Sequence, residues 1–364
     1  MCRKRMKGGR PPLLLAVCLS LLLSLPSCKP AEVPSRSQTR FLFDTVVTLT
    51  AWDPYTNAYY SAVGKSRPDL DKVLAGAMAL CQRYEALFSR TKEGSDVWRI
   101  NHARGMPVEV DGETAALLTR CRYYSELTQG AFDVTIAPVS GLWDFHSDTP
   151  VVPDGDALAE AAARVDYRRL SVEGRTVVLP ADMAVDLGGA AKGYIADRVA
   201  AYFLEQGVDS ALLNFGGNVM AVGGKANKQE SRQETARHPF SIGVRDPAGG
   251  QADLAATAYI ESGSVVTSGV YERYFEKDGR RYHHILSPVD GWPVDNELAS
   301  VTIFSEGSTD GDILSTACFV LGREKGMELI ESQEGVEALF IDNMGNIAAS
   351  SGLLIEGREI RILS

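Results

Sequence analysis

The sequence predicts an α+β fold in which helices pack on mixed or antiparallel sheets. Strand-like and helix-like segments follow one another without the regular βα alternation of a doubly wound parallel sheet. The 364 residues are 45% hydrophobic and 23% charged, which is typical of a soluble globular protein. No segment repeats in the way that a solenoid or propeller requires. A boundary near residue 150 is compatible with this pattern, but the sequence does not establish two independent domains.

The first 27 residues have the pattern of an export signal. Five basic residues and no acidic one accompany a 13-residue apolar run, 13–25. Such a run is too short to span a membrane and suits the hydrophobic region of a signal peptide. It ends in Leu25-Pro-Ser-Cys28, which resembles a bacterial lipobox. We therefore predict cleavage before Cys28 and lipidation of its thiol; an ordinary secretory signal or an uncleaved anchor is the alternative.

These features predict an exported protein, lipid-anchored to the bacterial cell membrane and facing the periplasm or the cell exterior. Residues 28–39 would hold the lipidated cysteine and a linker containing Pro and Ser, and the folded domain is expected at 40–364. Without 1–27 and their five basic residues, 32 basic residues remain against 47 acidic ones, a net charge of −15. Because such a body repels phosphate backbones, we do not expect it to bind nucleic acid.

The first half of the folded domain is expected to contain one strand, three helices and a hairpin. Alternation with Val and Thr predicts the strand, and apolar residues at helical spacing predict the first helix. The hairpin is expected to turn at Glu173-Gly174. In chain order these elements are expected at 41–52, 69–89, 113–128, 156–164 and 169–179.

The second half is expected to begin with a short strand and a glycine-rich segment that leads into a helix ending near residue 206. A polar stretch, 225–238, is predicted to be an insertion between strands, and short strands dominate 240–304. The other elements are expected as strands at 183–187, 210–215 and 218–222, helices at 309–321 and 324–332, and closing strands at 336–342 and 346–350.

Three cysteines would remain beside Cys28 in the exported chain: Cys81, Cys121 and Cys318. Each lies in an apolar, helix-like stretch, so we expect buried free thiols that pack as small hydrophobic groups. One disulfide is the alternative, and it would leave one thiol unpaired. The sequence contains no CxxC and no zinc-ligand spacing.

The first segment that could carry chemistry is Asp186-Leu-Gly-Gly-Ala-Ala-Lys192-Gly193, at a strand-to-helix junction. Glycines allow a close backbone approach, and the start of a helix offers free N–H groups to an anion. Lys192 could add positive charge near a phosphate, and Asp186 could accept hydrogen bonds from an amine. The segment is neither GxGxxG nor a Walker loop. A tight turn with an exposed lysine is the alternative interpretation.

The second segment is Thr309-Asp-Gly-Asp312-Ile-Leu-Ser315-Thr316. Asp312 and Thr316 are four residues apart, so their oxygens would share one face of a helix. Together with a backbone carbonyl and phosphate oxygens they would form a hard oxygen set suited to Mg²⁺. A capping box between Thr309 and Asp312 is the alternative, and it would leave Ser315 and Thr316 unexplained.

Two further segments contain candidate residues. His284 could act as a general base, since histidine titrates near neutral pH. Its neighbour His283 should point to the opposite face of a strand, which disfavours a shared metal. The stretch from Gly130 to Trp143 could place an aromatic ring and backbone around a flat ligand. A structural histidine and a helix C-cap with a packed strand are the respective alternatives.

As an ordered set, these motifs resemble the ApbE family, the FAD:protein FMN transferases, and the resemblance covers roughly residues 40–350. The segments that carry it are Phe43-Asp-Thr, Phe88-Ser-Arg-Thr91, Gly130-Ala-Phe-Asp133, Asp186-Leu-Gly-Gly-Ala-Ala-Lys-Gly193, Asn214-Phe-Gly-Gly-Asn218, Thr267-Ser-Gly269, His284-Ile-Leu-Ser-Pro288 and Asp312-Ile-Leu-Ser-Thr316.

The resemblance implies an FAD site between two lobes and a reaction that uses Mg²⁺. FMN would pass from FAD to a Thr or Ser hydroxyl of a flavoprotein, with release of AMP. The acceptors would be subunits of Rnf-type or sodium-pumping quinone reductase complexes. An FAD pyrophosphatase that gives FMN and AMP, or a non-catalytic flavin-binding lipoprotein, are the alternatives.

The resemblance also implies roles for individual residues. His284 would be the base. The Mg²⁺ ligands would be Asp312, Thr316 and the backbone oxygen of Gly189. The residues expected near FAD are Phe43, Thr91, Ala131, Phe132, Asp133, Asp186, Lys192, Leu286 and Ser315. The chain departs from the family at Ser287, where an aspartate is usual, and this puts the efficiency of transfer in doubt more than FAD binding.

Overall fold

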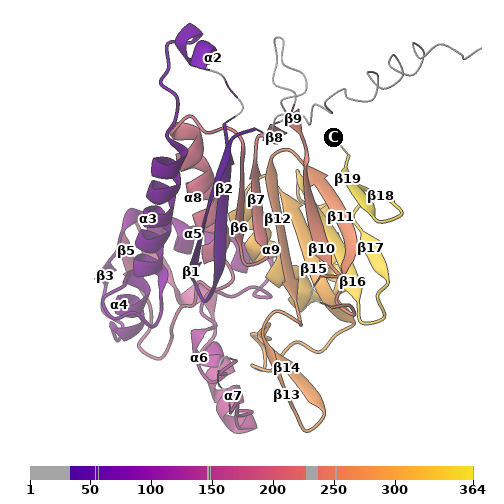
Figure 1. Ribbon diagram of the computed structural model, residues 1–364. Helices are drawn as coiled ribbons and strands as arrows, with labels where there is room; N and C mark the ends of the chain where they lie inside the picture. Colours follow the sequence, from indigo (N-terminus) through magenta and orange to yellow (C-terminus); the bar gives the residue numbers. More distant parts are fainter. Residues whose placement is uncertain are drawn as a thin grey trace, which may run out of the picture.

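The computed structural model describes residues 33–53, 55, 57–145, 147, 149–226, 237–250 and 252–363 (Figure 1). The predicted signal peptide, Cys28 and most of the predicted insertion at 225–238 lie outside the described residues. Within the described ranges, no helix is long and apolar enough to cross a membrane.

An eight-stranded sheet forms the centre of the fold, and every neighbouring pair of its strands is antiparallel. Its strands, in spatial order, are β1 (Ser35–Leu42), β2 (Thr45–Trp52), β6 (Ala211–Phe215), β7 (Asn218–Val222), β12 (Gly263–Gly269), β15 (Leu298–Ser305), β16 (Val336–Asp342) and β17 (Ile347–Ala349).

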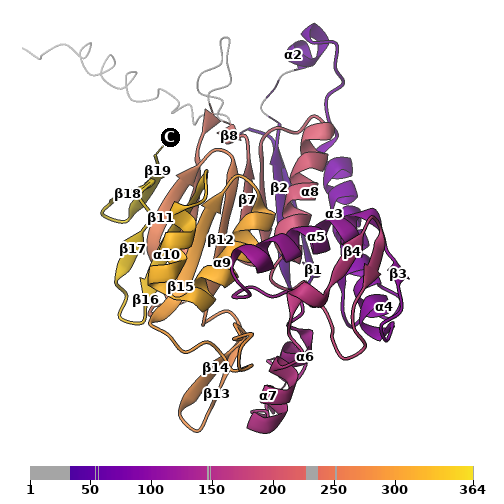
Figure 2. The same ribbon diagram turned by 180° about the vertical axis from the view of Figure 1, so that it is seen from behind.

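Helices cover one face of this sheet (Figure 2). The four that contact its strands are α3 (Leu70–Phe88), α8 (Ala191–Glu205), α9 (Ser308–Leu321) and α10 (Arg323–Glu331). Beside them lie α4 (Asp96–His102), α5 (Gly112–Leu127), the short helix η1 (Tyr167–Arg169) and a small sheet of β3 (Val108–Glu109), β5 (Thr176–Val178) and β4 (Ser171–Glu173). The interface is the main hydrophobic core, and it includes all three predicted free thiols, Cys81, Cys121 and Cys318, which are buried and unpaired.

A second sheet covers the other face over β7, β12, β15 and β16. Its strands, in spatial order, are β10 (Phe240–Arg245), β11 (Leu254–Ile260), β19 (Glu359–Ile362) and β18 (Leu353–Glu356), and the β11–β19 pair is parallel. Because β16 is covered on both faces, its residues alternate between the two cores: Phe340 packs against the helices, and Leu339 and Ile341 pack against the second sheet. These sheets confirm the α+β prediction.

Two segments project from one end of the sheets and pack against each other (Figure 1). One consists of α6 (Ala137–Ser140) and α7 (Gly155–Ala162), and the other is the hairpin of β13 (Tyr274–Lys277) and β14 (Arg280–His283). Val139, Trp143 and Leu158 from the helical segment meet Phe275 and Leu286 in a small separate core. At the other end lie α2 (Asn57–Ala62) and the pair β8 (Lys225–Ala226) and β9 (Arg237–His238).

Most predicted helices and strands are confirmed, but four predictions are wrong. The strand expected at 41–52 is the hairpin β1–β2, and β1 begins at Ser35, inside the expected linker. The strand expected at 183–187 is a single bridge, between Ile136 and Ala184. The chain does not close at 350, since β18 and β19 follow. The sequence also did not reveal α2, α4 and α6.

Two hairpin turns of the central sheet pack against each other. Gly216, in the β6–β7 turn, has a φ of +67°, and a Cβ there would lie 1.9 Å from Oγ1 of Thr45 at the start of β2. Gly335 has a similar φ of +71°, but a Cβ there would meet nothing within 4 Å. Alanine at either position therefore suffers the same backbone strain, and only Gly216 adds a steric clash.

We expect Gly335→Ala to lower the free energy of unfolding by about 1–2 kcal/mol through backbone strain alone. Gly216→Ala should cost about 1–3 kcal/mol more, because the new methyl group overpacks the contact with Thr45. Urea unfolding of the two variants measures the difference. Equal losses of unfolding free energy in the two variants would show that the β6–β7 turn at Gly216 is not tightly packed against Thr45.

Candidate active site

Helices α8 and α9 each supply a carboxylate that accepts hydrogen bonds from backbone N–H groups in the first turn of the other helix. Asp197 of α8 accepts hydrogen bonds from the backbone N–H groups of Ser308 (2.6 Å) and Thr309 (2.9 Å) at the start of α9. In return, Oδ2 of Asp312 in α9 accepts the N–H of Gly193 in the first turn of α8 (3.0 Å). N–H groups in the first turn of a helix have no hydrogen-bond acceptor within that helix. Each of these two helices therefore provides the missing acceptor for the other.

Gly193 permits this close contact between the helices. A Cβ at this position would lie 2.2 Å from the backbone oxygen of Ser308 and 2.8 Å from Cβ of Asp312. Any side chain here would separate α8 from α9. The glycine is therefore required by packing, and the rest of the segment from Asp186 to Lys192 is held by this contact.

The capping-box interpretation of Thr309 and Asp312 is wrong. The N-cap of α9 is Gly307, which provides no side-chain hydrogen bond, and Asp197 supplies the cap from another helix. Asp312 points to Gly193 instead. Its side chain is buried, and among the described residues only its Oδ2 has a hydrogen-bond partner.

The three predicted metal ligands lie on α9 and on the glycine-rich segment that leads into α8, and these two segments are in contact. A Cβ on Gly189 would lie 3.6 Å from Oγ1 of Thr316, so the backbone at Gly189 faces that hydroxyl. Asp312 is one turn before Thr316 on α9, and its Oδ1 is uncommitted among the described residues. One carboxylate, one hydroxyl and one backbone carbonyl are oxygen donors of the kind that Mg²⁺ takes while keeping waters or phosphates as its other ligands. The residues present therefore fit Mg²⁺.

Ser315, which was expected near FAD, is fully buried. Its hydroxyl donates to the backbone oxygen of Asp312 (2.9 Å) and lies 2.8 Å from Oγ of Ser268 on β12. Sequence reasoning placed Ser268 only within the Thr267-Ser-Gly269 motif and gave it no role. No group of three or more His, Cys, Asp and Glu side chains in the described ranges could hold a metal, so the candidate site depends on a single carboxylate.

Asp186 belongs to a polar cluster that links three elements. Its Oδ2 accepts from Oγ of Ser140 (2.8 Å) and lies 3.3 Å from Nη1 of Arg90, and its Oδ1 accepts the N–H of Gly188 (2.9 Å). Arg90 precedes Thr91, which is exposed on the same loop. Arg90 and Ser140 were not singled out from the sequence, because neither lies in a motif with Asp186.

The Gly130–Asp133 turn packs beneath Gly189 through Phe132. A Cβ on Gly189 would lie 3.2 Å from Cε2 of the buried Phe132. Asp133 follows, and it accepts from the N–H (2.8 Å) and hydroxyl (2.6 Å) of Thr135 and from the N–H of Tyr167 (3.0 Å). Burial raises the pKa of Asp133. Both carboxylate oxygens of Asp133 are thus used in hydrogen bonds that stabilise the turn. Ala131, which precedes Phe132 in this turn, is half-buried.

The two adjacent histidines have different surroundings, as their alternation predicted. His283 is buried, with its ring edge-on to Phe319 and its Nε2 3.1 Å from the backbone oxygen of Val294. His284 is half-buried, and its Nδ1 lies 3.3 Å from the backbone oxygen of Arg273. A carbonyl is only an acceptor, so this contact assigns the ring proton to Nδ1 and leaves Nε2 as an acceptor.

Deep placement and two nearby cations, Arg273 and Lys192, lower the pKa of His284 to about 3. The half-buried ring keeps some contact with solvent, so burial acts together with these charges. Lys192 also lies near Glu272, which the sequence did not single out. Glu272 is partly exposed, but the protein atoms packed around its carboxyl reduce its solvation and so raise its pKa. The positive charge of Lys192 acts in the opposite direction and lowers this pKa. Lys192 thus contributes positive charge to the surroundings of both Glu272 and His284.

The last two predicted residues, Phe43 and Leu286, form no hydrogen bond with the candidate metal ligands among the described residues. Phe43 has a φ of +54° in the two-residue β1–β2 turn, and its N–H donates to Oε1 of Glu85 on α3 (2.9 Å). Leu286 lies in the core of the projecting segments, two residues after His284. The structure thus brings Gly189 next to Thr316, and Ser315 and Thr316 next to the backbone oxygen of Asp312. Lys192 contributes positive charge to the surroundings of His284.

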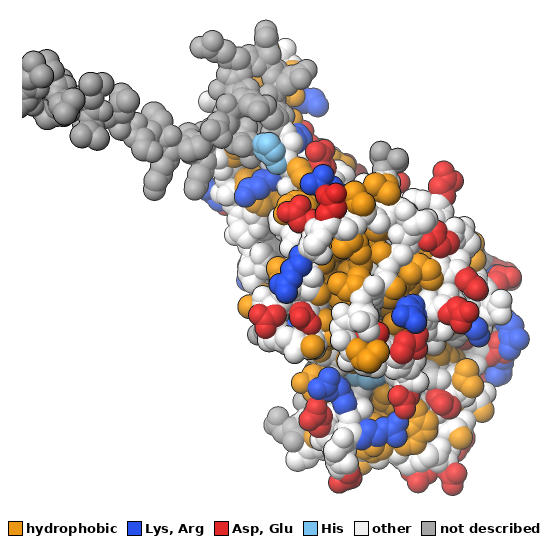
Figure 3. Space-filling model, turned by 90° about the vertical axis from the view of Figure 1, so that its right-hand side faces the viewer, with side chains coloured by type: hydrophobic (Ala, Val, Ile, Leu, Met, Phe, Trp, Pro, Cys, Tyr) orange, Lys and Arg blue, Asp and Glu red, His pale blue; other side chains and the backbone are white. Residues whose placement is uncertain are grey.

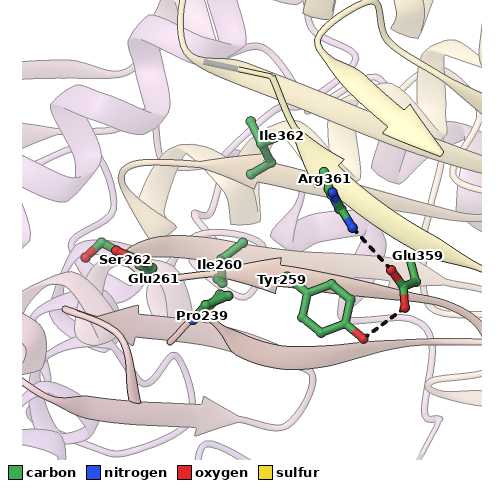
Figure 4. Close-up of a pocket in the computed structure, with 8 residues that line it drawn as sticks. All are labelled: Pro239, Tyr259, Ile260, Glu261, Ser262, Glu359, Arg361 and Ile362. Carbon is green, nitrogen blue, oxygen red and sulfur yellow. Dashed lines mark hydrogen bonds and ion pairs between the residues drawn. The ribbon is translucent and has the colours of Figure 1, made fainter. Parts of the chain in front are cut away.

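A hollow of about 590 Å³ lies on the second sheet and contains none of the predicted residues (Figure 4). Its lining includes Tyr259, whose hydroxyl lies 3.5 Å from Glu359, and Arg361, which lies 3.7 Å from the same carboxylate. The surface on this side of the molecule carries apolar side chains among charged ones (Figure 3). This hollow is not the candidate active site, because its lining contains neither the predicted metal ligands, Gly189, Asp312 and Thr316, nor His284.

Comparisons with known proteins show which family this chain is similar to. A sequence model of the ApbE family matches residues 43–340. The chain is 39% identical over 295 residues to the FAD:protein FMN transferase of Treponema pallidum (strain Nichols), covering 79% of this chain and 81% of that protein. It is 38% identical over 305 residues to a Klebsiella pneumoniae (strain 342) protein of the same name, covering 80% and 91%.

Solved structures show the same fold. The ApbE protein of Thermotoga maritima aligns with a TM-score of 0.75 at 32% identity, covering 87% of this chain and 97% of that one. The flavin transferase ApbE from Vibrio cholerae aligns with a TM-score of 0.74 at 26% identity, covering 88% and 98%.

The cap that Asp197 supplies should be measurable as stability. We expect Asp197→Ala to lower the free energy of unfolding by about 1–3 kcal/mol, because it leaves buried N–H groups of α9 without a partner. Asp310→Ala is the matched control at the same helix start. It removes a partly exposed ion pair with Arg120 and should cost less than about 1 kcal/mol. Chemical denaturation compares them, and an equal loss would contradict the cross-helix cap.

Proposed function

The chain belongs to the ApbE family, and we propose that it is an Mg²⁺-dependent FAD:protein FMN transferase. The observation that supports this proposal is the contact between α9, which bears Asp312 and Thr316, and the glycine-rich segment at the start of α8, which contains Gly189 and Lys192. The names of its relatives support the same activity. The reaction moves FMN from FAD to a Thr or Ser hydroxyl of an acceptor protein and releases AMP.

The pyrophosphate of FAD would lie at the start of α8. Asp312, Thr316 and the backbone oxygen of Gly189 would hold Mg²⁺, which when bound neutralises charge on the phosphates. Lys192 adds a positive charge on the same segment and lies near His284. The ring of Phe132 packs against the backbone at Gly189 and would support this segment. Asp186 would meet the adenine end through a carboxylate that Ser140 and Arg90 orient.

The acceptor hydroxyl must lose its proton as it attacks. Its oxygen forms a bond to the phosphorus of the FMN moiety, and the bond from that phosphorus to the bridging oxygen breaks, so that AMP leaves with that oxygen. His284 takes the hydroxyl proton at Nε2, since its Nδ1 is held by the backbone oxygen of Arg273. The low pKa keeps this nitrogen unprotonated at neutral pH.

Ser287 preserves the turn that follows His284. Its N–H donates to the backbone oxygen of Trp292 (2.8 Å), its carbonyl accepts from Gly291 (2.9 Å), and its Oγ accepts from Val289 (3.3 Å). Serine hydroxyls close such turns in the same way as aspartate carboxylates, although more weakly. The departure from the family therefore removes a negative charge without removing the turn.

We also propose export and lipid anchoring, which the lipobox at Cys28 supports. The acceptors would be flavoprotein subunits of Rnf-type or sodium-pumping quinone reductase complexes. Six residues, 29–34, separate Cys28 from β1. Fully extended, they span at most roughly 20 Å. An anchored enzyme would therefore stay next to the membrane, where those complexes expose their subunits.

Incubation of the purified protein with FAD, Mg²⁺ and a flavin-acceptor domain tests the function. In-gel flavin fluorescence on the acceptor is the expected result. Free FMN beside an unlabelled acceptor would instead assign an FAD pyrophosphatase, and FAD binding without turnover would assign a flavin-binding lipoprotein.

Asp312→Asn separates the metal role from the structural one. The amide oxygen can still accept the N–H of Gly193, but the carboxylate charge is lost. We expect kcat/KM for FAD to fall at least about 100-fold, or about 2.7 kcal/mol, with little change in the melting temperature. Asp310→Asn on the same helix is the control and should retain turnover. Turnover that survives in Asp312→Asn would refute the metal assignment.

The pH profile of transfer should report His284. Because the pKa of its ring is lowered to about 3, we expect no loss of base function between pH 8 and 5, with the acid limb of kcat/KM appearing below pH 5. Arg273→Gln removes a repelling cation but keeps the backbone oxygen, so the acid limb should move to higher pH. An acid limb near pH 6.5 in the native enzyme would contradict the lowered pKa.

His284→Ala should reduce transfer far more than FAD binding, measured by fluorescence titration. His283→Ala serves as its control, since His283 packs in the core and should affect stability first. Equal losses of binding and transfer in His284→Ala would assign His284 a structural role.

A further inference from the structure

We propose that Ser268 is a positioning residue for the magnesium site, because its hydroxyl accepts the proton of Thr316 and so turns a lone pair of Oγ1 toward the metal. This inference rests on the proposed function. It concerns a residue on β12 whose side chain contacts α9. Oγ of Ser268 lies 2.8 Å from Oγ of Ser315 and 3.4 Å from Oγ1 of Thr316.

The direction of these hydrogen bonds follows from counting protons. Ser315 has one hydroxyl proton, and it donates this proton to the backbone oxygen of Asp312 (2.9 Å). In the 2.8 Å contact with Ser268, Ser315 can therefore only accept, and Ser268 must donate. Ser268 has then used its single proton. Towards Thr316 it can act only as an acceptor.

Thr316 has two possible acceptors at the same distance. Its Oγ1 lies 3.4 Å from Oγ of Ser268 and 3.4 Å from the backbone oxygen of Asp312. That carbonyl already accepts the hydroxyl of Ser315 and, as residue i−4 of the helix, the N–H of Thr316. Its two lone pairs are thus occupied. Ser268 is the acceptor with spare capacity.

This arrangement suits a bound Mg²⁺. A hydroxyl that binds Mg²⁺ without losing its proton uses a lone pair as the ligand and must send the proton elsewhere. A proton shared with Ser268 lies on the β12 side of Thr316, while the backbone of Gly189 faces Oγ1 of the same residue. Outer groups that orient a ligand in this way typically change metal affinity by about 10–100-fold when removed.

The same strand provides a matched control. Ser264 lies four residues before Ser268, on the same face of β12, and its hydroxyl donates to Ser308 of α9 (3.0 Å). It is buried, and it touches neither Thr316 nor Ser315. Ser264→Ala therefore removes a strand-to-helix hydroxyl contact of the same kind, at a distance from the metal ligands.

The test is a Mn²⁺ titration of the full-length protein, with the free ion followed by its electron paramagnetic resonance signal. We expect Ser268→Ala to raise the Kd for Mn²⁺ at least tenfold, and Ser268→Thr, which keeps a hydroxyl, to restore it to within about threefold of the native value. In FAD turnover, the Mg²⁺ concentration for half-maximal rate should rise in the same proportion, while kcat at saturating Mg²⁺ stays within about threefold.

Three results would overturn the proposal: an unchanged Kd in Ser268→Ala, an equal rise in Ser264→Ala, or no Mn²⁺ binding by the native protein. The first of these leaves the transferase function intact if the native protein labels its acceptor. Conversely, Mn²⁺ binding that weakens only in Ser268→Ala supports the role of Ser268 even if the native protein does not turn over FAD.

Discussion

The exchange of carboxylates between α8 and α9 fixes the two helix starts that carry the candidate phosphate and metal groups. Asp312 holds the first turn of α8 through Gly193, and Asp197 holds the first turn of α9. Each helix start carries orphan N–H groups and a positive end of a dipole, so a buried carboxylate is stabilised there without a cation. Asp312 can therefore remain buried and still keep one oxygen uncommitted for a metal.

The sheets supply the rigid support for this pair of helices. The helix-covered face of the central sheet forms the main core, and the second sheet covers the opposite face, so β12, β15 and β16 are packed on both sides. A one-residue slip of such a strand would move every side chain into the opposite core, whose packing it does not match. That register keeps Ser268 opposite Ser315 and Thr316. The small core of the projecting segments holds Leu286 and, through the following turn, the chain next to His284.

Local patterns predicted what depends on local interactions. The apolar stripe of α3 and the glycine-rich entry to α8 were both visible, because their spacing follows from helix geometry. The β1–β2 turn was not, since its first residue, Phe43, is a bulky residue that rarely adopts the left-handed conformation found there. This left-handed conformation is held by Glu85, a residue 42 positions away. In the same way, β18 and β19 are short and exposed on one face, and they become strands by pairing with each other and with β11.

By itself, the sequence determined the fold class, the order of the motifs, the family and the residue types that could bind a metal, a phosphate and a proton. It also predicted that His283 and His284 face different ways, because alternation is a property of the backbone. Only the tertiary structure decided that Asp312 accepts the N–H of Gly193 instead of capping its own helix. It also decided that Ser315 is buried and in contact with Ser268. These choices depend on hydrogen bonds between residues 119 and 47 positions apart. The energy of such bonds comes from burial and mutual satisfaction, which no short stretch of sequence contains.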